Sequence, residues 1–177
     1  MLYLLVLLGV IGFVVVIVGL LLPTTYVARR QIVVNAPRDT VHGLVNDLER
    51  WRVWEPWTQK DPTVEMVCGE GSPTDQVGAT QSWTDKNGGG RLTITRIDPD
   101  FGIAYDVQFA GKYDCTASIQ HRAAGDAVEV IWELHGDTKM PVVGGFFAKL
   151  MPGMIEPMFA DGLQRLKAAA EAESAEA

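Results

Sequence analysis

Residues 91–109 read RLTITRIDPDFGIAYDVQF, and this stretch decides the class of fold. Apolar and polar residues alternate on both sides of the turn at 98–100, which is typical of two neighbouring antiparallel strands. Asp106 and Gln108 share the face that we expect to be solvated. The opposite face of the second run carries four apolar side chains: Ile103, Tyr105, Val107 and Phe109.

Similar runs flank this stretch on both sides, and turn residues separate them. Glycine-rich turns are predicted at residues 69–73 and 87–90, and the second turn indicates a hairpin. Together the runs predict about six or seven strands in an antiparallel meander. The further predicted strands are 26–34, 64–67, 79–85, 116–121 and 128–134.

Two short helical segments are expected between the first strand and the rest of the sheet. Pro37 breaks the strand and is well placed to begin a helix. Four apolar residues then follow at helical spacing: Val41, Leu44, Val45 and Leu48. A second short helical turn carries Trp51, Trp54 and Trp57.

A long helix is predicted to close the chain, because apolar residues from Phe146 to Leu166 recur at steps of three and four. Pro152 and Pro157 interrupt this pattern, since proline removes a helical hydrogen bond and clashes with the preceding turn. We therefore expect a break or kink near Pro152, and we expect the acidic end 168–177 to fray. One sheet and one long helix define an α+β fold. If the sheet curls, a space remains beneath the helix, and that space is the candidate functional site.

The N-terminus is apolar and without charge. Residues 2–22 read LYLLVLLGVIGFVVVIVGLLL, which as a helix would span roughly 30 Å, the thickness of a bilayer core. We expect an uncleaved single transmembrane helix; a signal peptide is the alternative, but it would need a charged start and a cleavage site. Arg29, Arg30 and Arg38 follow the span, and the positive-inside rule then puts the domain in the cytoplasm. Arg29 and Arg30 are also explained as ordinary strand residues.

Charge and metal-ligand spacing exclude several functions. The net charge is −7 and the isoelectric point is about 4.9, which argues against a nucleic-acid partner. Cys68 and Cys115 do not make a disulfide framework. The histidines His42, His121 and His135 lack metal-ligand spacing and are expected at the surface or in loops. We therefore expect neither a metal nor a cofactor.

An ordered set of short sequences resembles the START-like superfamily, also called SRPBCC, and in particular its polyketide cyclase/dehydrase and lipid-transport branch. The set begins with IVVNAPRDTVHGLVNDLERW from Ile32 and with the tryptophan-rich run that ends at Asp61-Pro62. It continues with GGGRLTI, IDPDFGIAYDVQF, VEVIWELHGD and DGLQRLKAAAE, and covers residues 26–171. The resemblance implies a helix-grip fold, in which a curved antiparallel sheet wraps around a long C-terminal helix. With the apolar N-terminus, which is not general in the family, we expect an anchor at 1–22, a ligand-binding domain at 26–171 and an acidic tail at 172–177.

Members of this superfamily enclose an apolar cavity for lipids, sterols, polyketides, quinones or plant hormones. The resemblance, together with the positions of large apolar side chains, suggests which residues line such a cavity here. They are Trp57, Trp83, Tyr105, Phe109, Trp132, Phe147, Met151, Met154 and Met158. Ordinary core packing is the alternative for each of them, and we expect it for Trp51 and Trp54.

Three functions remain open from the sequence. The first is membrane-tethered binding of a hydrophobic small molecule, with no catalytic residue assigned. The second is a cyclase, dehydratase or hydrolase acting on a polyketide-like or aromatic substrate, which requires an ionisable side chain in the cavity. Asp106, His121 and Glu133 are the residues to inspect for that role. The third is a partner-binding module with a vestigial cavity, whose protein partner the sequence does not identify.

Overall fold

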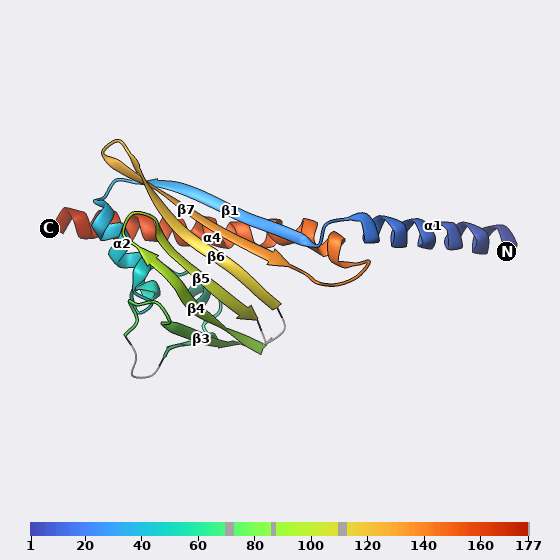
Figure 1. Ribbon diagram of the computed structural model, residues 1–177, viewed down its shortest axis with the longest axis horizontal. Coiled ribbons are helices and arrows are strands. Elements are labelled where there is room, and N and C mark those ends of the chain that lie inside the picture. The colour runs from blue at the N-terminus through green and yellow to red at the C-terminus, as the bar shows by residue number, and fades with distance from the viewer. Residues whose placement is uncertain (70–72, 86–87, 110–112, 177) are drawn as a thin grey trace.

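One seven-stranded antiparallel sheet forms the centre of the protein (Figure 1). The computed structural model describes residues 1–69, 73–85, 88–109 and 113–176. The strand order is β1-β7-β6-β5-β4-β3-β2, so the predicted meander is confirmed and the first strand pairs with the last. The strands are β1 (Thr25–Val34), β2 (Glu65–Cys68), β3 (Thr80–Asp85), β4 (Gly88–Asp98), β5 (Gly102–Phe109), β6 (Tyr113–Ala124) and β7 (Ala127–Asp137).

The alternation predicted for β5 is confirmed by burial. Tyr105 and Val107 are buried, whereas Asp106 and Gln108 are exposed on the outer face. Several strands are longer than predicted, because pairing with a neighbour extends a strand into residues with no strand preference of their own. Of the predicted glycine-rich turns, residues 70–72 and Asn87 lie outside the described part of the chain.

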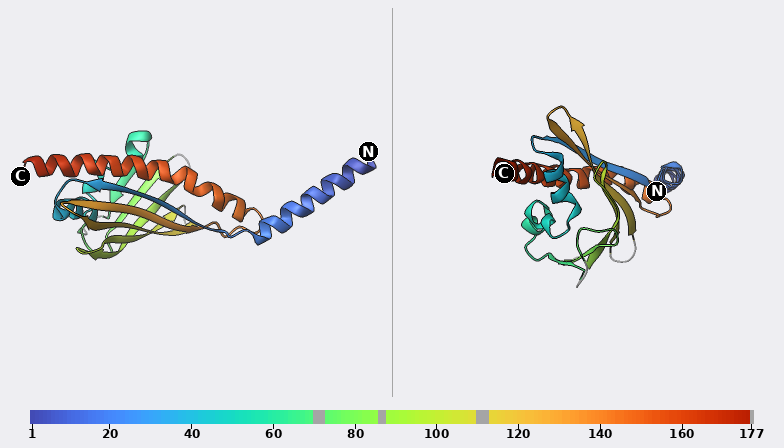
Figure 2. Two further views of the ribbon diagram at one scale, coloured as in Figure 1. Left: turned by 90° about the horizontal axis from the view of Figure 1, so that it is seen from above. Right: turned by 60° about the vertical axis from the view of Figure 1, so that its left-hand side comes forward.

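The long helix α4 (Gly144–Glu176) lies along β1 and is continuous through both prolines (Figure 2). We expected a break or a kink near Pro152; a break there is wrong, whereas the helix does bend in its N-terminal half (Figure 2). Packing against the sheet outweighs the hydrogen bonds that the two prolines remove. An ion pair of 2.8 Å between Arg30 of β1 and Glu156 lies in the same half of the helix.

The C-terminal end of α4 does not fray as expected, because side chains tie it to the domain. The amide of Asn35 donates to Glu171 at 2.8 Å, and Arg50 pairs with Glu173. Lys167 donates to the carbonyl oxygen of Val33 at 2.8 Å. The helix therefore continues to Glu176.

Three short helices fill the concave side of the sheet: α2 (Arg38–Asn46), η1 (Arg50–Val53) and α3 (Trp57–Lys60). Pro37 lies at the N-cap of α2, as predicted. Trp51 and Trp54 have no exposed surface, so the expectation that they pack the core is confirmed. With the sheet and α4 these helices complete an α+β helix-grip architecture.

The apolar helix α1 (Leu2–Leu21) extends away from the domain (Figures 1 and 2). It is long and apolar enough to cross a membrane, and nearly all of its residues are exposed. Only Leu22, Pro23 and Thr24 separate it from β1. β1 begins at the end of the sheet nearest to α1, and we call this end of the sheet the α1 end. The strand register brings the C-terminal ends of β5 and β7 to the α1 end as well.

Candidate functional site

A cluster of aromatic rings fills the interior between β7, α4 and the short helices. At its centre, the ring of Trp132 stacks on Phe159 of α4, with centroids 4.2 Å apart and planes 7° from parallel. Trp54 and Trp57 meet Trp132 edge-on, at 5.5 Å and 5.8 Å between centroids. Such arrangements are favoured by the charge distribution of the rings. This part of the interior is therefore packed with side chains.

Three indole nitrogens of this cluster are hydrogen-bonded within the protein. The indole nitrogens of Trp51 and Trp54 donate to carbonyl oxygens of Val45 and Leu44, at 2.8 Å and 2.9 Å. The indole nitrogen of Trp132 donates to the hydroxyl of Tyr105 at 2.7 Å. Burial raises the pKa of that hydroxyl, so Tyr105 stays neutral and is not a base at ordinary pH. Tyr105 and Trp132, both predicted to line a cavity, belong to this packed cluster.

A second aromatic pair lies at the α1 end of the sheet. Trp83 of β3 and Phe109 of β5 face each other across Gly90 of β4, with centroids 5.6 Å apart. A Cβ atom at Gly90 would lie 2.2 Å from the ring of Trp83, so the glycine makes room for the indole. Phe109 is 41% exposed, and Trp83 is half-buried.

Gly88, Gly89 and Gly90 belong to β4 rather than to the predicted hairpin loop. The interpretation of this run as a loop is therefore wrong, although the hairpin between β3 and β4 is present. These residues pair with β3 and so extend the strand. Glycine is needed at positions 89 and 90 because both lie too close to Trp83 for a side chain.

An apolar stripe runs along the N-terminal half of α4. Its members follow one another at steps of four, three and four residues: Phe147, Met151, Met154 and Met158. Phe147 is 46% exposed and Met154 is 65% exposed, while the other two are half-buried. Asp161 comes next at helical spacing and pairs with Lys60 of α3 at 3.6 Å. The stripe therefore lies on the side of α4 that leads to α3.

By their contacts and exposure, the predicted site residues fall into three groups. Trp57, Tyr105 and Trp132 pack in the interior, whereas Trp83 and Phe109 lie at the α1 end of the sheet. The α4 stripe is the most exposed of the three groups.

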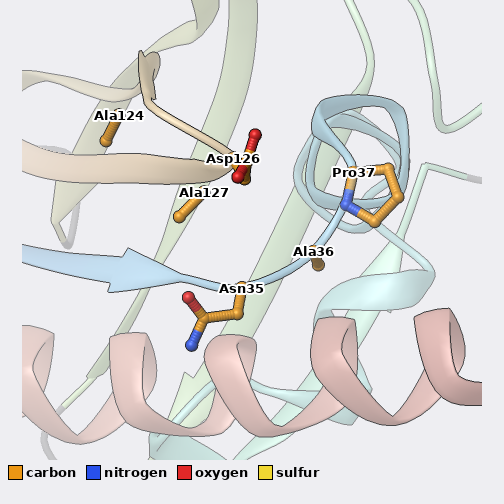
Figure 3. A pocket seen from close by; sticks show the side chains of 6 residues that line it. All are labelled: Asn35, Ala36, Pro37, Ala124, Asp126 and Ala127. Atoms are coloured by element: carbon orange, nitrogen blue, oxygen red, sulfur yellow. The ribbon is translucent and has the colours of Figure 1, made fainter.

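The structure also has a hollow of about 400 Å³ at the end of the sheet away from α1 (Figure 3). Small and polar residues line it: Asn35, Ala36, Pro37, Ala124, Asp126 and Ala127. None of the predicted ligand-binding residues contributes to it.

A buried histidine cluster was missed by the sequence analysis. His121 of β6 is 1% exposed, which corrects the expectation of a surface residue. Its Nδ1 atom accepts a hydrogen bond from Arg38 Nε at 3.1 Å, and its Nε2 atom lies 3.0 Å from Nδ1 of His42. Arg38 also pairs with Asp100 at 3.0 Å. The strand alternation from Cys115 through Ile119 to His121 was the signal that could have predicted its burial.

The same contacts set the protonation of the cluster. Burial, followed by the charges of His42 and Arg38, lowers the pKa of His121 to about 4. Burial and Arg38 also lower the pKa of His42. Because arginine only donates, Nδ1 of His121 accepts, and its ring hydrogen is on Nε2 for donation to His42. Within the described part of the chain, no group of three or more histidine, cysteine or acidic side chains is arranged to hold a metal ion.

The other two residues singled out for acid–base chemistry lie on the outer face of the sheet. Asp106 is exposed, and Glu133 pairs with Arg29 and His135, at 3.7 Å and 2.6 Å. Neither residue approaches the α4 stripe or the aromatic cluster, because strand alternation points them away from both. Asp106, His121 and Glu133 therefore do not form one site.

Comparison with solved structures identifies the fold. Protein TTHA0849 of Thermus thermophilus superposes with a TM-score of 0.62 at 17% identity, over 84% of this chain and 99% of that one. Protein CV1439 of Chromobacterium violaceum superposes with a TM-score of 0.60 at 15% identity, over 82% of this chain and 98% of that one. The Aha1 dimer from Colwellia psychrerythraea superposes with a TM-score of 0.57 at 15% identity, over 82% of this chain and 96% of that one. At these identities the likeness concerns the fold alone.

The family is identified by sequence. Residues 26–171 match the family described as polyketide cyclase / dehydrase and lipid transport. The chain belongs to this family, and the resemblance to the SRPBCC superfamily is confirmed. No curated protein matches the chain.

Proposed function

We propose that the protein binds a hydrophobic small molecule, such as a lipid, a quinone or a polyketide-like compound, while α1 tethers it to a membrane. The α4 stripe carries this proposal, because it leaves four large apolar side chains partly exposed along one face of the helix. Methionine side chains adapt their shape and are common on surfaces that accept varied apolar partners. Membership of a family that includes lipid-transport proteins supports the same class of ligand.

The tether suits a ligand of this kind. A molecule that partitions into lipid would reach a tethered domain without crossing bulk water. The aromatic pair Trp83 and Phe109 supports this arrangement, since it lies at the α1 end of the sheet. Trp57, Tyr105 and Trp132 would then form the floor of the site rather than its opening.

Native mass spectrometry on the full chain in lipid nanodiscs, with solvent extraction of bound material, tests this function. We expect a discrete bound mass with the wild-type chain. Met154→Lys should abolish it, because a charge in the stripe repels an apolar ligand. Ala168→Lys is the matched control, since Ala168 is exposed further along the same helix, and it should keep the bound mass. A mass retained by Met154→Lys would refute the assignment to the stripe.

The aromatic cluster favours a second candidate, a partner-binding module whose interior is filled by side chains. Trp132 and Phe159 occupy the interior that a ligand would otherwise use. The same experiment distinguishes the two, because a wild-type chain with no bound mass would support the module. The enzymatic alternative has less support, since Asp106 and Glu133 lie on the outer face.

A further inference from the structure

The segment that joins β7 to α4 lies against the last turn of α1. A Cβ atom added to Gly19 would lie 2.0 Å from the carbonyl oxygen of Val142 and 3.0 Å from the ring of Phe146. One at Gly145 would lie 2.3 Å from Cβ of Leu22. Gly19 is also buried, in contrast to the rest of α1. Glycine at position 19 therefore lets the segment pack directly on the helix.

If α1 spans the membrane as proposed above, the contact between Gly19 and Val142 fixes how deep the segment after β7 lies in the bilayer. Gly19 lies three residues before Leu22, which corresponds to roughly 5 Å along a helix axis. Val142 touches Gly19, so it must lie at the same depth as the end of the span. That depth corresponds to the boundary between lipid headgroups and acyl chains, where apolar segments insert by about 5–10 Å.

The side chains of the segment suit that boundary. Exposed apolar residues continue from Pro141 into the first turns of α4, with Val143 at 47% and Leu150 at 62% exposure. From residue 138 to residue 155 the only charged residues are Lys139 and Lys149. Lys139 also pairs with Asp114 at 3.8 Å, and Lys149 adds a positive charge that complements anionic headgroups.

Part of the backbone of the segment is hydrogen-bonded internally, which reduces the cost of a poorly hydrated environment. The amide of Val143 donates to the carbonyl of Pro141 at 2.6 Å, and the amide of Gly144 donates to Met140 at 3.0 Å. Pro141 itself has no N–H group. The first of these bonds closes a γ-turn around Val142, whose φ of 62° is strained for a β-branched residue. Such strain persists where surrounding contacts fix the conformation, and here the contact is with Gly19.

We propose that residues 139–150 form a second contact with the bilayer, lying at the headgroup–acyl boundary beside α1. The occupant of this apolar surface is the lipid of the membrane that α1 spans, with anionic headgroups near Lys149. This contact rests on the proposed tether but not on ligand binding. It holds the domain in one orientation, with the α1 end of the sheet facing the membrane.

A fluorescent probe at position 143 tests the proposal in the full chain. The chain carries Cys68→Ser and Val143→Cys, is labelled with the environment-sensitive dye NBD, and is reconstituted in vesicles of phosphatidylcholine and phosphatidylglycerol. Cys115 is buried and is kept. The Cys68→Ser chain without a new cysteine is the control that measures how much dye reacts with Cys115. The same label at Ala123→Cys, an exposed site at the far end of the sheet, is the reference. We expect blue-shifted emission at 143 and several-fold stronger quenching by doxyl-labelled lipid than at 123.

Substitutions in α1 provide a matched pair of variants. Gly19→Leu should displace the segment and reduce the lipid quenching at 143 towards the level at 123. Gly12→Leu should leave the quenching unchanged, because nothing lies within 4 Å of a Cβ atom at that position.

Vesicle flotation separates the failure of the tether from the failure of the contact. A chain that does not float with the vesicles overturns both. A chain that floats with a water-exposed probe at 143 overturns only the contact. A probe shielded from water but not quenched by doxyl lipid also overturns it, because a second copy of the chain would then cover the surface. Bound ligand is measured separately by mass spectrometry, so failure of the contact and failure of ligand binding are distinguishable.

Discussion

Acidification should destabilise the protein through the buried histidine cluster. The pKa of His121 is about 4 in the folded chain, against an ordinary value of 6.5. The unfolded chain therefore takes up a proton more readily, and folding loses stability as the pH falls. The contribution of His121 is complete above about pH 6.5 and is lost progressively down to about pH 4.

The size of the effect follows from the pKa difference. A shift from 6.5 to about 4 corresponds to about 3 kcal/mol, lost at up to about 1.4 kcal/mol per pH unit. Physically, a protonated ring would have to give up the hydrogen bond from Arg38 and lie between that cation and His42. The carboxylates with lowered pKa, Asp98 and Glu171 among them, have ordinary values of 4.5 or below. Their effect sets in about one pH unit above those values, so the range from about pH 7.5 to 5.5 isolates the histidines.

Urea unfolding of the full chain in detergent micelles, followed by tryptophan fluorescence between pH 7.5 and 4.5, measures this dependence. His121→Gln is the informative variant, because glutamine can accept from Arg38 and donate to His42 but does not titrate. We expect the free energy of unfolding to vary less with pH in the variant. Equal pH dependence in the two chains would refute the reasoning.

Four further predictions concern stability and are measured by thermal unfolding with circular dichroism. Trp132→Ala should cost about 3–5 kcal/mol, because it removes the ring at the centre of the aromatic cluster. Glu55→Ala should cost about 1–3 kcal/mol, since this buried carboxylate accepts the amide hydrogen bonds at the start of α3. Gly90→Val should cost about 1–3 kcal/mol by colliding with Trp83. Gly153→Ala meets nothing within 4 Å and should instead stabilise α4 by about 0.5–1 kcal/mol.

Much of the fold was predictable because alternation and helical spacing are local signals. The antiparallel meander and the long final helix followed from them, whereas the pairing of β1 with β7 did not; the burial of Trp51 and Trp54 was also expected. The continuity of α4 through Pro152 was not predictable from propensity, because contacts with β1 distant in sequence stabilise the helix. Tertiary packing outweighs local preference in such a segment.

The site was less predictable than the fold. Core residues and cavity residues are of the same types, so Tyr105 and Met154 looked alike in sequence, although one is buried and the other 65% exposed. His121 was misplaced because its partners, Arg38 and His42, lie about eighty residues away in the chain. The pairing of α1 with the segment after β7 likewise depends on a contact between distant residues, here Gly19 and Val142.

The pairing of β1 with β7 has a consequence for the order of folding. Thr25 meets Asp137 and Val34 meets Val128, so the first strand to leave the ribosome has no strand partner until the last one is made. The five strands between them pair with their neighbours in sequence and can form earlier, since nearby segments close smaller loops. The strand attached to α1 is therefore the last to be added to the sheet. During synthesis, β1 remains an unpaired edge that is open to association with other chains until β7 and α4 cover it.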